Sequence, residues 1–318
     1  LEQFGASPIT HKSYLFEREH SLEKYNANDL FLPYATSLRM SDVGYQSNIQ
    51  DSLKISYNNL DEFINALVKG IKTPVKKFND IGMFDDAGIA QQISTGILQI
   101  ENELYDIVRP KRSGPSGSRP ASLLKTGGIE YLELRGIDVN PFIPEGIDVS
   151  KIKLLDIYIT HSLISESPLI SDKEIEEIKA NQKIMVSKGR LKNVMLSKNG
   201  DLISLAELRK NFLAELEQTA EALDEYSEGY LKAFHLEINK NMLLSEKILT
   251  EMDVKGFEFQ EYALNQSKKI AENYGSSDTS DFYTLTNSAQ TSIENLRNLE
   301  ESSSMDINKY VELYNSKI

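Results

Sequence analysis

Apolar residues recur with the period of an amphipathic helix near the middle of the first half of the chain. They fall at intervals of three and four: Leu60, Phe63, Ile64, Leu67, Val68 and Ile71. Because residues three and four apart lie on the same side of a helix, the pattern predicts a helix over 60–71. Asn59 with Glu62 three residues later is a suitable N-cap, and Thr73-Pro74 marks the end.

The same periodicity dominates the chain beyond residue 145. A second stripe predicts a helix that contains Val149, Ile152, Leu155, Ile159 and Leu163. Ser204 and Glu207 have the spacing of a capping box and predict the start of another helix, and two or three more are expected between Tyr226 and Tyr274. The Ser-rich, acidic segment 275–318 is expected to be a loosely attached tail.

Two shorter segments, 98–105 and 131–135, alternate between apolar and polar residues. Alternation with a period of two predicts strands that have one apolar and one polar face. The polar face then meets either solvent or an active site. Together these patterns predict an α+β chain in three parts: a sheet-containing portion (1–145), a helical portion packed on the sheet (146–274) and the tail (275–318).

Composition excludes several classes of protein. The 318 residues contain no Cys, which removes disulfides, thiol nucleophiles and Cys-ligated metals, and the four His are isolated along the sequence. A formal charge of −13 disfavours sequence-independent binding to nucleic acid. We find no stretch that is long and apolar enough to cross a bilayer and no signal-peptide pattern, so we expect a cytoplasmic protein without membrane or nucleic-acid partners.

Basic residues are concentrated between Tyr105 and Arg135. This stretch holds six basic and three acidic residues, a local charge of +3 in a chain of −13. Its central part, 109–120, is expected to be a loop between the two strands. Two interpretations stay open: a solvated loop, or a clamp in which Arg side chains bind an anion through their fixed pairs of donors.

Glu133 and Arg135 stand two residues apart on the second predicted strand, and therefore on one face. They could form only a surface ion pair, which contributes little stability. Alternatively, Glu133 could join other carboxylates that face a cavity and hold magnesium, which prefers oxygen ligands and substrate phosphates.

Seven blocks of sequence lie in the first 142 residues: Phe4-Gly-Ala-Ser-Pro8, Leu32-Pro-Tyr-Ala-Thr-Ser-Leu-Arg39, Ser41-Asp-Val-Gly-Tyr45, Ile71-Lys-Thr-Pro74, Leu98-Gln-Ile-Glu-Asn-Glu-Leu-Tyr105, Arg109-Pro-Lys-Arg112 and Gly127-Gly-Ile-Glu-Tyr-Leu-Glu-Leu-Arg135 followed by Asp138-Val-Asn-Pro-Phe142. In content, order and approximate spacing they resemble the proteobacterial type of glutamate-cysteine ligase. The likeness is dense to about residue 162 and thinner to about residue 274.

The resemblance implies a ligase that uses ATP and Mg²⁺ to join the γ-carboxyl of L-glutamate to the amine of L-cysteine through an acyl phosphate, the first step of glutathione biosynthesis. It implies part of a glutamine-synthetase-like antiparallel sheet funnel over 1–145. Carried over by position, Glu133 is a magnesium ligand and Arg135 is the catalytic residue at the transferred phosphoryl group. Arg39, Tyr45 and Tyr105 bind the cysteine substrate.

The family also has an N-terminal part before the first block, and this chain begins there, without Met. We therefore expect an incomplete chain that is inactive without the missing N-terminal segment of the same polypeptide. The main alternative is a non-catalytic fragment that acts as a binding or scaffold module. A third possibility is a relative that uses an amine other than cysteine.

Overall fold

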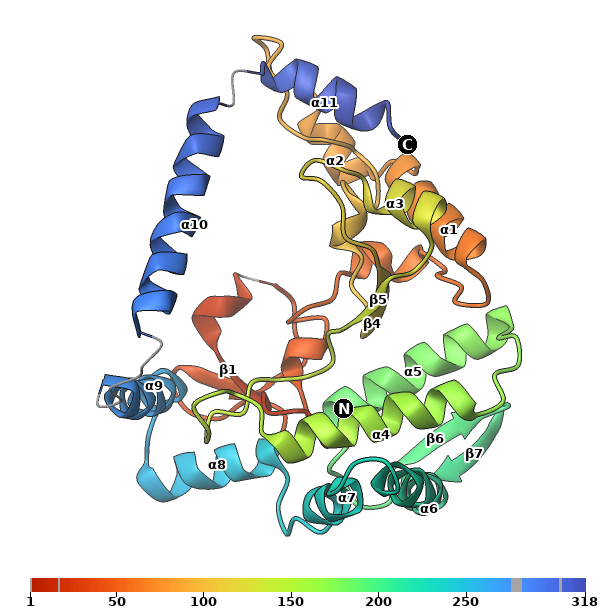
Figure 1. The fold of residues 1–318 in the computed structure, drawn as a ribbon, viewed down its shortest axis with the longest axis vertical. Coiled ribbons are helices and arrows are strands. Elements are labelled where there is room, and N and C mark those ends of the chain that lie inside the picture. The colour runs from red at the N-terminus through yellow and green to blue at the C-terminus, as the bar shows by residue number, and fades with distance from the viewer. Residues whose placement is uncertain (1, 17, 276–281, 303–304) are drawn as a thin grey trace. The chain divides into compact units, whose positions relative to one another are not determined.

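The computed structural model describes residues 2–16, 18–275, 282–302 and 305–318 (Figure 1). Its strands form three small sheets: β1 (Ile9–His11), β3 (Asp29–Phe31) and β2 (Glu23–Lys24) in that order, β4 (Val108–Lys111) with β5 (Tyr131–Leu134), and β6 (Met195–Lys198) with β7 (Asp201–Ser204).

The described helices are α1 (Leu60–Lys72), α2 (Lys76–Ile81), α3 (Pro120–Gly127), α4 (Val149–Ile164), α5 (Asp172–Lys188), α6 (Leu205–Asp224), α7 (Tyr230–Ile238), α8 (Leu244–Lys255), α9 (Phe259–Gly275), α10 (Phe282–Ser302) and α11 (Ile307–Asn315). Four short 3₁₀ turns accompany them: η1 (Lys12–Leu15), η2 (Leu38–Met40), η3 (Asn48–Ser52) and η4 (Glu101–Glu103). The α+β class and the mostly helical second half are as predicted, while the curvature of strands into a funnel stays a prediction.

The chain forms two compact units, each assembled from separate segments. The first comprises Leu1–Asn58, Tyr105–Arg109 and Glu133–Ser267, and the second comprises Asn59–Leu104, Pro110–Leu132 and Lys268–Ile318. The division at 145 and 274 into a catalytic sheet portion, a helical portion and a tail stays a prediction.

Local signals placed three of the helices correctly. The Asn59 side chain accepts a hydrogen bond from the Glu62 amide at 2.9 Å and begins α1, as predicted. Ser204 accepts from the Glu207 amide at 3.2 Å and begins α6. Each cap satisfies one of the free amides in the first turn of its helix. The helix predicted from Val149 is α4.

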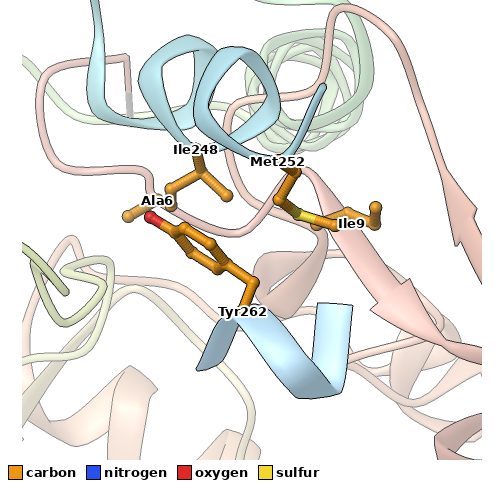
Figure 2. Close-up of a cluster of buried hydrophobic side chains, with 5 residues drawn as sticks. All are labelled: Ala6, Ile9, Ile248, Met252 and Tyr262. Atoms are coloured by element: carbon orange, nitrogen blue, oxygen red, sulfur yellow. The ribbon is translucent and has the colours of Figure 1, made fainter. Parts of the chain in front are cut away.

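Two buried apolar clusters hold the first unit together. One joins α4, α6 and α7 through Leu154, Ile157, Leu216, Ala220 and Phe234. The other cluster packs the N-terminal segment against α8 and α9, and its buried members are Ala6, Ile9, Ile248, Met252 and Tyr262. Figure 2 shows the ring of Tyr262, from α9, turned toward the other four side chains. Burial of such side chains is the main force that stabilises the unit.

The face of α4 that packs differs from the predicted stripe. Leu154 and Ile157 are buried, whereas Val149 and Leu163 are 69% and 83% exposed. The helix carries apolar residues on all sides, so periodicity alone did not identify the packed side. In the part of the chain that the structure describes, no helix has both the length and the apolar character needed to cross a bilayer.

In the second unit, α1, α3 and η4 pack together, and α11 belongs to the same unit. Val311 and Tyr314 of α11 are buried, and the Asn315 side chain donates to the Ile93 carbonyl at 2.7 Å. The end of the segment expected to be a loose tail is thus anchored by side-chain packing. Residues 276–281 and 303–304 of that segment lie outside the described residues.

The strand predicted over 98–105 was wrong. This segment contains the short turn η4, and the strand that pairs with β5 is β4, a few residues later. Glu101, which alternation assigned to the polar face, is only 4% exposed because it pairs with the buried Arg119. An ion pair between residues distant in sequence has therefore overridden the local pattern.

The β6–β7 hairpin was missed, although its turn has a clear signature. Asn199 and Gly200 both have positive φ, 58° and 88°. Asn-Gly favours the tight turn that matches the twist of two antiparallel strands. The Glu177 carboxylate accepts from the amides of both turn residues at 3.0 and 2.8 Å, so α5 fixes this turn.

Candidate active site

The five site residues predicted from the sequence all lie in the first unit. Arg39 belongs to η2, Tyr45 follows that turn, and Tyr105 follows η4. Glu133 stands on β5 and Arg135 comes just after it. The amide of Arg135 donates to the Ile107 carbonyl at 2.6 Å, which places the segment after Tyr105 beside the end of β5.

The Glu133 carboxylate lies between two guanidinium groups. Its Oε2 atom accepts from Arg109 Nε at 2.9 Å and from Arg109 Nη2 at 2.5 Å, and its Oε1 atom lies 3.2 Å from Arg135 Nε. The side chain of Arg109 is 5% exposed, against 31% for Glu133 and 22% for Arg135. Arg109 therefore holds the carboxylate from the buried side, and Arg135 lies nearer to solvent.

Arg135 also contacts one of the predicted tyrosines. Its Nη1 donates to the Tyr45 hydroxyl, and its guanidinium carbon lies 4.9 Å from the centre of the Tyr45 ring. The rings of Tyr45 and Tyr105 meet edge to face, with their centroids 4.5 Å apart. Burial, and then the nearby charge of Arg39, lower the pKa of Arg135, although a guanidinium stays charged at neutral pH.

Arg39 is held by backbone carbonyls and by one carboxylate. Its Nε donates to Asp138 Oδ1 at 2.6 Å, and its Nη2 donates to the Ile137 carbonyl at 3.0 Å and to the Arg135 carbonyl. These bonds join η2 to the segment that follows β5. The side chain of Arg39 remains 37% exposed.

A close approach of the backbone joins Arg39 to Tyr45. The Tyr45 amide donates to the Arg39 carbonyl at 2.5 Å, so the chain folds back on itself after η2. A Cβ atom at Gly44 would overlap the carbonyl oxygens of Leu38 and Arg39. Glycine is required here because only it leaves room for the turn.

Three guanidinium groups converge on two carboxylates in this cluster. Arg39 pairs with Asp138, Arg109 and Arg135 pair with Glu133, and the partly buried carboxylate of Asp106 also acts on Arg109. A partly buried cluster of this kind, with two arginines that reach solvent, suits an anionic ligand such as a carboxylate or a phosphoryl group. We call the three arginines, together with Glu133 and Asp138, the arginine cluster.

Three arginines of the basic stretch differ from both interpretations of that stretch. Arg109 belongs to β4 and is buried on Glu133, and Arg119 is buried on Glu101, with two bonds of 2.9 and 3.1 Å. Arg112 donates to the carbonyl of Gly127. These residues form neither a fully solvated loop nor a clamp that is open to a ligand.

A magnesium ion needs several oxygen ligands close together. In the described ranges, no three His, Cys, Asp or Glu residues come close enough together to hold a metal. Glu133 Oε2 already accepts from Arg109, and Oε1 already forms an ion pair with Arg135. The carboxylates of these ranges therefore do not fit a magnesium site by themselves, and Glu133 as a metal ligand stays a prediction.

Sequence reasoning did not assign roles to Asp138 or to the pairing of Arg109 with Glu133. Asp138 and Arg109 each fall in a block that carried the resemblance, and this was the only hint in the sequence that they belong to the site. Their partners are 99 and 24 residues away, and no local pattern indicates such pairings.

A family model described as glutamate-cysteine ligase matches residues 3–185, more than half of the chain. The chain belongs to the glutamate-cysteine ligase family. A glutamate-cysteine ligase of Pseudomonas putida is 36% identical over 99% of this chain and 61% of its own length, and one of Alcanivorax borkumensis is 37% identical over 83% and 52%.

A solved glutamate-cysteine ligase from Francisella tularensis, in complex with AMP, superposes with a TM-score of 0.87 at 27% identity, over 98% of this chain and 63% of its own. The fold of the described chain is therefore that of this family. The chain spans about three-fifths of the length of these glutamate-cysteine ligases.

Proposed function

We propose that the arginine cluster is part of the active site of an ATP-dependent glutamate-cysteine ligase. The observation that carries the proposal is the convergence of Arg39, Arg135, Tyr45 and Tyr105 in one unit of a chain from this family. A site that handles two amino acids and a triphosphate must bind carboxylates and phosphoryl groups, and guanidinium groups are well suited to both.

The chemistry proposed for the site has two steps. In the first, the γ-phosphoryl group of ATP passes to an oxygen of the glutamate γ-carboxylate, which gives an acyl phosphate and ADP. In the second, the amine of cysteine attacks the acyl carbon, an amide bond forms, phosphate leaves and the nitrogen loses a proton. A free carboxylate is a poor acyl donor, so the first step is what makes the second possible.

Within this proposal, Arg135 stabilises the negative charge that builds up on the transferring oxygens. Its position on the exposed side of Glu133, with the Tyr45 hydroxyl as a second partner, fixes the guanidinium before the substrates arrive. Donors that are fixed in advance need no reorganisation during the reaction.

Arg39 binds the α-carboxylate of the acceptor amino acid, and Tyr45 and Tyr105 form the adjoining wall. The family's sheet funnel and its use of Mg²⁺ with ATP belong to the same proposal. The wall does not by itself define the side chain of the acceptor, so an amine other than cysteine is a second outcome to be measured.

The test is an assay of the full-length gene product, meaning the product of the complete open reading frame that encodes this chain. With ATP, magnesium ions, L-glutamate and L-cysteine present, we expect γ-glutamylcysteine and ADP in equal amounts, and no product when either amino acid is omitted. Mass spectrometry identifies the peptide. A panel of other amines separates a different acceptor from the absence of ligation, and absence of product with every amine would favour the binding or scaffold alternative.

A further inference from the structure

Asp138 is a buried carboxylate next to the arginine cluster's most exposed member. Its side chain is 5% exposed, and both of its oxygens are used. Oδ1 accepts from Arg39 Nε at 2.6 Å, while Oδ2 accepts from the Ala6 amide at 2.7 Å and from the Ser7 hydroxyl at 2.8 Å. A carboxylate with this many donors is held in a single orientation.

The bonds of Asp138 tie Arg39 to the core of the first unit. Ala6, whose amide donates to Asp138, also packs its side chain in the cluster around Ile9 and Tyr262 (Figure 2). The amide of Asp138 donates to the Phe4 carbonyl at 3.0 Å. The packed N-terminal segment thus fixes Asp138, and Asp138 in turn restricts the guanidinium of Arg39, whose side chain is 37% exposed.

The hydrogen bonds that hold Arg39 use only some of the N–H groups of its guanidinium. Nε and Nη2 donate to Asp138 and to the carbonyls of Ile137 and Arg135. Within the described ranges of the chain, Nη1 donates to no protein acceptor. Since the guanidinium is planar and rigid, fixing one edge also fixes the direction in which the remaining N–H groups point.

We propose that Asp138 is a positioning residue that aims the guanidinium of Arg39 at the α-carboxylate of the acceptor amino acid. The inference rests on the proposed function and adds to it a residue that does not touch substrate. Asp138 also balances the charge of Arg39 beside the like charge of Arg135, as Glu133 does for Arg135 itself. Arg39 therefore has a carboxylate to itself, whereas Arg135 shares Glu133 with the buried Arg109.

The test compares Asp138→Asn with wild type in the full-length gene product. Asparagine keeps the size of the side chain but removes the charge and one acceptor. We expect KM for cysteine to rise roughly 10- to 100-fold, with kcat and KM for ATP within about threefold, because only the aim of the acceptor's carboxylate is lost. In an Arg39→Lys background, Asp138→Asn should raise KM for cysteine no further.

Asp29→Asn is the matched control. Asp29 is also fully buried in the first unit and its carboxylate accepts from a backbone amide, that of Phe259 at 2.8 Å, but it does not contact Arg39. A general loss of stability would affect both variants alike. A rise in KM for cysteine in Asp29→Asn of the same size as in Asp138→Asn, or independent effects of Asp138→Asn and Arg39→Lys, would overturn the positioning role.

A second readout does not depend on activity. NMR of the arginine Nε–H groups should show a slowly exchanging signal for Arg39 in the wild type and in Asp29→Asn, and its loss in Asp138→Asn. An unchanged Arg39 signal in Asp138→Asn overturns the inference. If wild type makes no γ-glutamylcysteine but the NMR result is as expected, the proposed function fails while the positioning of Arg39 by Asp138 holds.

Discussion

Replacing Arg135 with Lys is expected to lower kcat of the full-length gene product about 100- to 1,000-fold, the range found when one fixed donor to a developing negative charge is removed. Lysine keeps the positive charge but lacks the rigid fork that contacts Glu133 and the Tyr45 hydroxyl together. Steady-state kinetics with both amino acids and ATP measure the effect.

Arg209→Lys is the control for this substitution. Arg209 lies on α6 in the same unit, is 42% exposed and pairs with Glu2, far in the sequence from the arginine cluster. Its kcat should equal that of wild type. A kcat for Arg135→Lys within threefold of wild type would remove Arg135 from the catalytic role.

Replacing Glu101 with Gln should strongly destabilise the second unit, because it breaks a buried ion pair. The Glu101 and Arg119 side chains are 1% and 0% exposed, and the pair is bidentate. Glutamine leaves the buried guanidinium without an anion, so we expect the free energy of unfolding to fall by about 3–5 kcal/mol. Urea unfolding followed by circular dichroism suits a chain without Trp.

Two further variants separate the buried charge from a general effect of substitution. Asp80→Asn breaks the exposed pair with Lys76 and should leave the urea midpoint unchanged, since exposed pairs contribute little. Replacing both partners, as Glu101→Leu with Arg119→Met, should restore most of the lost stability because no unpaired charge remains buried. A loss below about 1 kcal/mol in Glu101→Gln would contradict the account of this pair.

The elements that the sequence predicted correctly are those governed by local interactions. The Asn59 cap of α1 and the Ser204 cap of α6 involve residues three positions apart, and the structure confirms both helices. The 98–105 strand failed because Glu101 is buried by a partner 18 residues away. The stripe on α4 failed to indicate the packed face because that choice depends on α6 and α7.

For the candidate site too, the sequence identified some residues and missed the partners that lie far away along the chain. Resemblance in sequence blocks selected Arg39, Tyr45, Tyr105, Glu133 and Arg135, and the structure brings them into one unit. Their roles stay predictions. The partners that orient them, Asp138 for Arg39 and Arg109 for Glu133, could not be assigned from the sequence, because a salt bridge over 99 or 24 residues leaves no periodic signal.

Transfer of oxygen from substrate to phosphate tests the central claim most directly. The full-length gene product is supplied with ATP, magnesium ions, cysteine and L-glutamate labelled with ¹⁸O in the γ-carboxyl group. If an acyl phosphate forms and the amine displaces phosphate, one labelled oxygen should appear in inorganic phosphate for each γ-glutamylcysteine formed. Unlabelled phosphate from a reaction that makes the peptide would contradict the acyl phosphate, and no peptide with any amine would contradict the ligase itself.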